Sequence, residues 1–319
     1  MVVALPLIEQ DFELSTSSAE SVVSTLMLGA VIGSLVGGFV SDWIGRKPAN
    51  LITAALFLGG SLLMTFAGSL RTMLVGRFIA GLAVGSSGPC VSTYVAEIAP
   101  PKTRGALVTI NEVMVCFGCL LSVVVSAGLQ DSALHDGDHL LVSHLSKEVW
   151  VGVAKLAGVC LAVAIVDRVG RRPLLLIGTS LMLSCHFIFA LCFWTLDMTH
   201  SETVQAIGEL NLYAFIFAWN LSWAPLMWVT CSELLPDEFR SIGMGITFGT
   251  FWLGSALVNQ TLLSVFHTIG TGNAFLFYTT LTAGSLGFVY FKVPETMGLT
   301  FEQIGLLFSE RVAHTHNVV

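Results

Sequence analysis

The chain has 319 residues, of which 54% are hydrophobic and only 11% are charged, and its formal net charge is −7. Its mean hydropathy is +0.81. A soluble domain carries about a quarter charged residues. The composition therefore excludes an ordinary water-soluble domain and indicates an integral membrane protein.

Long apolar stretches with few charges follow one another along the whole chain. A helix needs roughly 20 apolar residues to cross a bilayer. The stretches that meet this length are approximately 18–40, 49–68, 73–97, 106–128, 149–166, 174–196, 207–231, 241–266 and 273–292. We therefore predict an all-α membrane protein with about nine transmembrane helices.

Patterns of enzyme chemistry are missing from the sequence. It contains no nucleophile–base motif, no phosphate-binding glycine loop and no cluster of metal ligands. The seven cysteines lie inside or at the edges of apolar stretches, where we expect them to act as small packing residues. We predict a protein that is not an enzyme and that has no catalytic residues, no metal, no cofactor and no nucleic-acid partner.

The basic residues are distributed unevenly between the two sides of the predicted topology. Ten of the fourteen Lys and Arg residues lie in segments that share one side, namely 41–48, 98–105, 167–173, 232–240 and the C-terminal end from Lys292 onwards. The opposite loops hold Arg71 and Lys147 together with several acids. By the positive-inside rule the first group is cytoplasmic. The C-terminus is then inside and, with nine spans, the N-terminus is outside.

Two motifs occur twice, in the same order. Residues 42–48, D-W-I-G-R-K-P, are echoed by residues 167–173, D-R-V-G-R-R-P. The spacing E-x-x-P-x-x-x-R occurs at 97–104 and again at 233–240. Each copy lies at a predicted cytoplasmic helix end in the same topological sense. This indicates a parallel repeat of the kind that relates the halves of some transporters.

Acids and arginines at abutting helix ends can form charge-assisted hydrogen bonds in one conformation and break them in another. We predict pairs of Asp42 with Arg46, Glu97 with Arg104, Asp167 with Arg171, and Glu233 with Arg240. The complete predicted gate consists of Asp42, Arg46, Lys47, Glu97, Arg104, Asp167, Arg171, Arg172, Glu233 and Arg240. The alternative is a set of basic loops that only determine topology, with incidental acids.

These motifs resemble the sugar porter branch of the major facilitator superfamily. The matching stretches are Gly38 to Pro48, Gly76 to Gly81, Glu97 to Ile110, Val166 to Pro173, Pro225 to Arg240 and Val293 to Leu299. The resemblance implies a helical bundle of two pseudo-repeated halves. It also implies alternating access to a central sugar site.

The chain departs from the twelve helices of that family. Most of the first helix and the counterparts of the sixth and seventh helices are not found. We predict an N-terminal half-bundle over 1–130, a hydrophilic connecting segment over 131–148, a C-terminal half-bundle over 149–293 and a cytoplasmic tail over 294–319.

Candidate sugar contacts are polar or aromatic side chains inside the predicted bundle. Glu112 lies in an apolar stretch, where an ionisable group suggests function. It matches a family position that is typically Gln, and it could bind sugar, carry a proton, or be a hydrated acid near a helix start. The resemblance places Trp228 and Trp252 at the sugar site, although Trp228 could also be an interfacial residue. Asn220 and Asn259 are secondary candidates or interhelical hydrogen bonds.

Two basic residues lie inside apolar stretches. The resemblance makes Arg77 a possible coupling residue, because in proton-coupled relatives the matching arginine is thought to pair with an acid of the first helix. That helix is mostly missing here, so the pairing cannot be made. Lys155 lies near the outer end of its stretch, and we expect it to snorkel towards the interface.

We interpret the chain as a multi-pass carrier of a hexose-like monosaccharide, either facilitative or coupled to protons by symport. Its expected partners are a sugar, protons in the symport case, and the lipid bilayer. The plasma membrane is favoured over an organellar membrane, and the sequence does not indicate an oligomeric state. The alternative is a transport-incompetent truncated relative, or a sensor or partner of a full-length sugar transporter.

Overall fold

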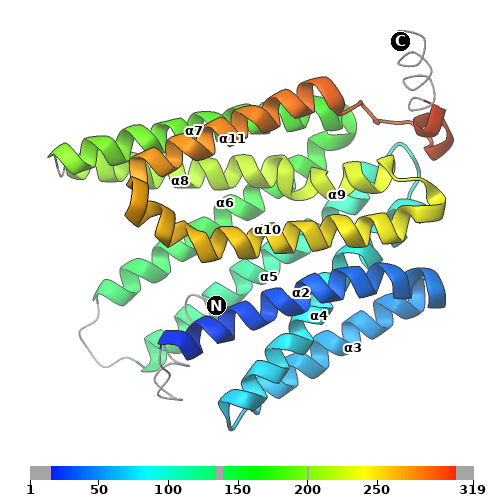
Figure 1. The fold of residues 1–319 in the computed structure, drawn as a ribbon, viewed down its shortest axis with the longest axis horizontal. Coiled ribbons are helices and arrows are strands. Elements are labelled where there is room, and N and C mark those ends of the chain that lie inside the picture. Colours follow the sequence, from blue (N-terminus) through cyan, green and yellow to red (C-terminus); the bar gives the residue numbers. More distant parts are fainter. Residues whose placement is uncertain (1–15, 134–138, 200, 307–319) are drawn as a thin grey trace. The chain divides into compact units, whose positions relative to one another are not determined.

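The computed structural model describes residues 16–133, 139–199 and 201–306 (Figure 1). Within these ranges the chain is nearly all helical and contains no β-strand. The helices are α2 (Thr16–Ile44), α3 (Arg46–Thr65), α4 (Leu70–Ile98), α5 (Arg104–Ala133), α6 (His139–Val169), α7 (Arg171–Thr199), α8 (Glu202–Leu221), α9 (Trp223–Leu234), α10 (Arg240–Ile269) and α11 (Thr271–Lys292), with a short 3-10 helix at Asp237–Phe239.

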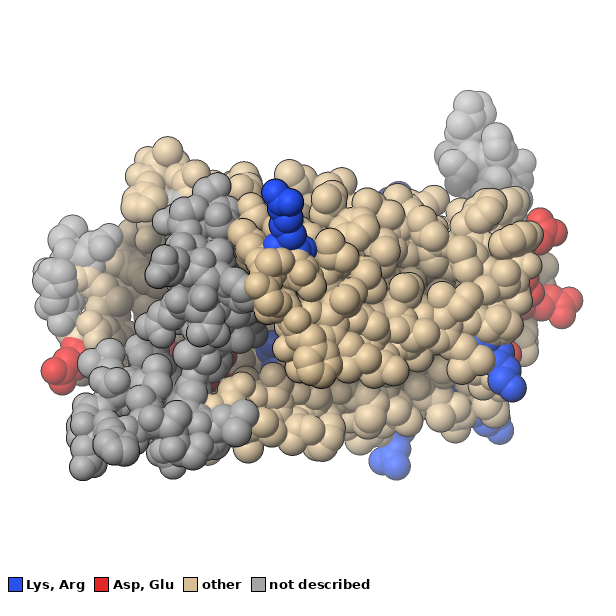
Figure 2. Space-filling model, turned by 90° about the horizontal axis from the view of Figure 1, so that it is seen from below, with Lys and Arg blue, Asp and Glu red and all other residues tan. Residues whose placement is uncertain are grey.

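The described helices provide nine stretches that are long and apolar enough to cross a membrane, with α8 and α9 counted together as one stretch. This confirms the predicted all-α membrane fold. Many large apolar side chains on these helices are exposed, among them Phe39, Leu58 and Phe291. Figure 2 shows a face on which charged side chains are few and most of the described surface is uncharged. Such a surface suits a hydrocarbon environment, where an apolar side chain costs nothing to expose.

The helices form two compact units. Unit 1 contains α2, α3 and α4, residues 231–234 of α9, and α10 up to Thr261. Unit 2 contains α5 to α8, the first part of α9 up to Thr230, the end of α10, and α11. Each unit therefore combines segments of both predicted half-bundles. The boundaries of those halves come from the sequence repeat and stay a prediction.

In unit 1, α4 packs along both α2 and α3. Glycines allow the helix backbones to approach closely. A Cβ atom on Gly29 would lie 2.5 Å from the carbonyl oxygen of Phe78, and one on Gly60 would lie 2.8 Å from the backbone nitrogen of Ala80. Small residues at helix contacts let van der Waals packing hold membrane helices together.

In unit 2, α6, α7, α8 and α11 pack around one apolar core. Helix α11 lies along α7, and α8 packs against both α6 and α7 (Figure 1). The buried core residues are Ala162, Val166, Leu174, Leu175, Leu221, Leu226 and Val289. The core therefore joins helices that come from several parts of the chain.

Three pairs of consecutive helices are joined by one glycine each. Gly45, Gly170 and Gly270 have φ angles of 92°, 99° and 82°. A residue with a Cβ atom rarely adopts this backbone conformation. The first two glycines, Gly45 and Gly170, occupy the same position in the two copies of the repeated motif. The backbone conformation is therefore repeated together with the sequence. The loop expected between the stretches 241–266 and 273–292 is thus reduced to Gly270.

The stretch predicted as one span over 207–231 is broken at Ser222, between α8 and α9. The amide of Ser222 donates to the carbonyl oxygen of Trp219 at 3.2 Å, which is a tighter turn than that of an α-helix. Pro225 explains the break. It has no N–H to donate to the carbonyl of Leu221, and its ring crowds that carbonyl.

The connecting segment predicted over 131–148 is helical at both of its ends. Helix α5 continues to Ala133 and α6 begins at His139, whereas residues 134–138 lie outside the described ranges. The segment contains no proline, so the two helices can extend beyond their apolar parts at its ends. The predicted remnant of a first helix before residue 16 also lies outside the described part of the chain.

Candidate functional site

The first copy of the repeated motif forms a charge cluster in unit 1. Arg46, at the start of α3, pairs with Asp42 of α2 at 2.5 Å and with Glu97 of α4 at 3.0 Å. Its Nε atom also donates to Glu97. Three helix ends are therefore linked through one guanidinium group, which remains partly exposed. Lys47, the next residue, is exposed.

Arg240 joins this cluster from the start of α10. It is nearly fully buried and lies 3.9 Å from Glu97. It also pairs with Asp237, and its Nε donates to the carbonyl oxygen of Ser232 at 2.9 Å. Glu233, the acid predicted to pair with Arg240, is buried as well. Glu97 thus contacts Arg46 and Arg240 in its own unit.

The second copy of the motif forms a cluster in unit 2. Arg171, at the start of α7, is fully buried and pairs with Asp167 of α6 at 2.9 Å. Asp167 also accepts a hydrogen bond from the backbone amide of Ala106 at 2.8 Å, which ties α5 to α6. Arg172 donates to the carbonyl oxygen of Tyr290 at 2.6 Å. Both copies therefore place an Asp–Arg ion pair beside a glycine with a positive φ angle.

Glu295 is the residue of this cluster that the predicted gate lacks. Its carboxylate accepts hydrogen bonds from the backbone amides of Arg171 and Arg172, both at 3.0 Å. A carboxylate at a helix N-terminus satisfies free N–H groups and complements the helix dipole. In the sequence, Glu295 belongs to the motif at 293–299 that carries part of the family resemblance, and this motif is the signal that points to it.

Arg104 contacts the segment that follows α11. Its Nη1 donates to the carbonyl oxygen of Leu299 at 3.4 Å, and its guanidinium lies 3.9 Å from the centre of the Phe301 ring. Ile304 in the same segment is buried. The predicted cytoplasmic tail is therefore packed against unit 2 over its first residues. The gating role of all these charges stays a prediction.

The candidate sugar contacts of unit 1 lie on α10. The indole Nε1 of Trp252 is buried and has no hydrogen-bond partner among the described residues. Its ring packs edge-on against Phe251, with centroids 5.5 Å apart. Asn259 is exposed, and its amide donates to the carbonyl oxygen of Ser255 at 2.9 Å. Of these two candidates on α10, Trp252 is therefore the one whose side-chain N–H is available to donate a hydrogen bond to a sugar.

In unit 2 the candidates lie on three helices. Asn220 of α8 is buried and already engaged, because its Oδ1 accepts from the Cys116 thiol at 3.3 Å and its amide donates to Ile216. This is the interhelical hydrogen bond that the sequence left open as an alternative. Trp228 of α9 is buried too. Glu112 of α5 is half-buried, as is Lys155 of α6, the helix that packs against α5.

Arg77 of α4 is buried in unit 1. Its Nη1 donates to the carbonyl oxygen of Val22 in α2 at 3.0 Å. A backbone carbonyl can stabilise a buried cation in a membrane span. The structure therefore connects Arg77 to α2 through a backbone carbonyl, and its coupling role stays a prediction.

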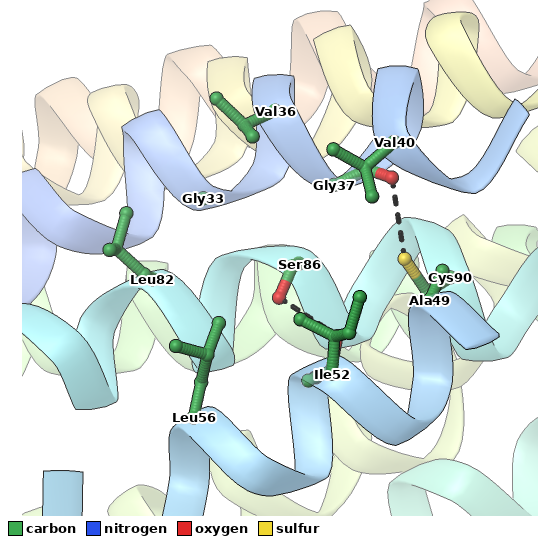
Figure 3. A pocket seen from close by; sticks show the side chains of 11 residues that line it. Gly33, Val36, Gly37, Val40, Ala49, Ile52, Leu56, Leu82, Ser86 and Cys90 are labelled. Carbon is green, nitrogen blue, oxygen red and sulfur yellow. Dashed lines mark hydrogen bonds between the residues drawn. The ribbon is translucent and has the colours of Figure 1, made fainter. Parts of the chain in front are cut away.

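A small cavity of about 100 Å³ lies between α2, α3 and α4 (Figure 3). Most of its lining is apolar, with Val36, Ile52 and Leu82 among the side chains that face it. Its hydroxyls from Thr53 and Ser86 hydrogen-bond to each other at 3.1 Å. A sugar needs several free donors and acceptors, so we do not assign the sugar site to this cavity.

Comparison with known proteins identifies the family. The family model described as "Sugar (and other) transporter" matches residues 6–143 and 139–308. The galactose-proton symporter of Escherichia coli (strain K12) is 24% identical over 411 aligned positions, which cover 94% of this chain and 88% of the relative. The glucose transporter GlcP of Staphylococcus epidermidis is 23% identical over 415 positions, which cover 97% and 92%.

Solved structures show the same fold. The structure of the proton:xylose symporter XylE bound to 6-bromo-6-deoxy-D-glucose has a TM-score of 0.80 at 19% identity, covering 96% of this chain and 94% of that chain. The inward-open conformation of the xylose transporter XylE from E. coli gives a TM-score of 0.66.

The alignments with the relatives extend over more positions than the 319 residues of this chain, which is therefore the shorter protein. The family model nevertheless matches nearly the whole length of the chain, including its helices and both copies of the charge motifs. The chain is a multi-pass integral membrane protein that belongs to the sugar porter family of the major facilitator superfamily.

Proposed function

We propose that this chain carries a hexose-like monosaccharide across a membrane by alternating access. The observation that carries the proposal is the pair of matching clusters, Asp42 with Arg46 in unit 1 and Asp167 with Arg171 in unit 2. The pair in unit 1 is partly exposed and can break and re-form at small cost, whereas Arg171 of the pair in unit 2 is buried and holds its partner more firmly. The names of the relatives, which include galactose-proton and arabinose-proton symporters, support a monosaccharide as the solute.

Within this proposal Trp252 contacts the sugar. Its free indole N–H can donate to a hydroxyl group, and its ring can cover the C–H face of the sugar. Loss of both contacts costs about 1–3 kcal/mol, or about a tenfold to hundredfold fall in affinity. We place the carrier in the plasma membrane.

The test is counterflow of labelled glucose in proteoliposomes, with galactose and xylose as competing sugars. Wild type should show saturable exchange, and Trp252→Ala should lose it at sugar concentrations near the wild-type half-saturation value. Trp150→Ala is the matched control, because Trp150 is an exposed tryptophan of α6, and it should exchange like wild type. Folded wild-type protein that exchanges no better than empty liposomes would instead support a transport-incompetent relative or a sensor.

A further inference from the structure

Glu112 and Lys155 are two charges of opposite sign inside neighbouring membrane spans of unit 2. Both side chains are half-buried, and their helices α5 and α6 pack against each other. Among the other acids in the described spans of this unit, Glu148, Asp167 and Glu202 lie at or next to the ends of their spans, and Glu209 lies about as far into its span as Glu112 does. An ionisable group at this depth is costly and usually functional.

The register of α5 and α6 gives the spacing of the two charges. The hydrogen bond from the Ala106 amide to Asp167 brings these two residues level. Glu112 follows Ala106 by six residues and Lys155 precedes Asp167 by twelve, which places them about 9 Å and about 18 Å above that level at 1.5 Å per residue. Their Cα atoms are therefore offset by about 9 Å along the helices.

This offset keeps the acid and the base apart while they still interact. No ion pair within 4 Å joins them among the described residues, and Coulomb attraction between opposite charges extends over about 9 Å where the dielectric constant is low. On α5 and α6, the titratable side chains nearest to them in sequence are the thiols of Cys116, Cys119 and Cys160. Helix α8 contributes the neutral amide of Asn220. Of the groups named here, Lys155 is the one that carries a positive charge.

We propose that Glu112 binds the coupling proton of this carrier and that Lys155 is its fixed counter-charge. The proposal rests on the proposed function and specifies how the transport is driven. With Glu112 ionised, the two charges sum to zero, so the empty carrier can reorient without moving net charge. With Glu112 protonated, Lys155 leaves one positive charge, which a membrane potential negative inside pulls inward.

The proton balance of the cycle is simple. A proton from the outer water forms an O–H bond with the Glu112 carboxylate before or with sugar binding. After reorientation the O–H bond breaks and the proton passes to water on the cytoplasmic side. The sugar crosses unchanged, and nothing is oxidised or reduced. One proton enters for each sugar.

The test compares sugar uptake with and without a proton gradient in proteoliposomes. Wild-type uptake should rise several-fold when the outside is made acidic, and it should rise further with a potential negative inside. In Glu112→Gln the ratio of uptake with the gradient to uptake without it should fall to one. Glu112→Asp should keep a ratio above one. Glu209→Gln, which removes an exposed acid of α8 that pairs with Lys147, should keep the wild-type ratio.

The outcomes separate this inference from the proposed function. Wild-type protein without counterflow would contradict the function itself. Wild-type protein with counterflow but no response to the gradient or potential would overturn the coupling inference alone, and so would Glu112→Gln with the wild-type ratio. If Glu112→Gln does not fold, the double variant Glu112→Gln with Lys155→Gln removes both charges and is measured in the same way. A ratio of one supports the coupling inference, and the wild-type ratio overturns it. The wild-type gradient and potential measurements decide the matter even without a folded variant.

Discussion

Gly170 carries both a backbone and a packing requirement at the second charge cluster. Its φ angle is positive, and a Cβ atom there would lie 2.6 Å from a carboxylate oxygen of Glu295. We expect Gly170→Ala to lower the free energy of unfolding by about 1–3 kcal/mol, because the strain displaces the carboxylate that caps α7. Thermal unfolding in detergent measures this as a lower midpoint.

Two further glycines serve as matched comparisons for Gly170. Gly45 has the same backbone conformation but no close neighbour for a Cβ atom, so Gly45→Ala should cost less. Gly208 lies in helix α8 with open space around it, so Gly208→Ala should be neutral or stabilise the protein by about 0.5–1 kcal/mol. Equal losses in all three variants would show that neither strain nor the Glu295 contact matters.

The seventh span, Glu202–Leu234, is not a continuous helix, because it is broken at Ser222 between α8 and α9. Without Pro225 the carbonyl of Leu221 regains a donor, and the helix can continue through Ser222. We expect Pro225→Ala to raise the unfolding midpoint, because the added hydrogen bond stabilises the helix. We also expect it to lower the maximal counterflow rate several-fold, because α8 and α9 can then no longer change their angle at the break during transport. The measurement is counterflow at saturating sugar.

Pro173 provides the control for that prediction. It lies in the first turn of α7, where the missing N–H is tolerated. Pro173→Ala should therefore leave both the midpoint and the rate close to wild type. A Pro225→Ala variant that matches wild type in rate would show that the break is structural only.

Hydropathy and charge predicted the number, order and approximate limits of the spans, because these depend on how long each stretch stays apolar. The positions and backbone angles of the turns could not be predicted from hydropathy and charge. Gly270 reverses the chain where a loop was expected, since apolarity locates the bilayer but not the backbone angle. Glu295 was not recognised as a helix cap because its partner amides lie more than a hundred residues earlier in the chain. Pro225 was visible, but the fold decides whether a proline bends a span or breaks it.

At the scale of the whole molecule, the predicted topology places residue 102 inside the cell and residue 202 outside. Lys102 lies between α4 and α5, Glu202 begins α8, and both are exposed. In a background where the seven native cysteines are replaced by serine, a membrane-impermeant thiol reagent should label Glu202→Cys in intact cells. Lys102→Cys should be labelled only after permeabilisation. The reverse pattern would invert the topology.

The single-glycine junctions restrict how the length of this chain can change over evolutionary time. One residue separates α2 from α3, α6 from α7 and α10 from α11, so an insertion or deletion there would rotate a whole following helix out of its packing. Additions and losses of sequence are tolerable only where a connection has residues to spare, as in 99–103 or 293–300. The gaps that separate this shorter chain from its relatives should therefore avoid all three glycines.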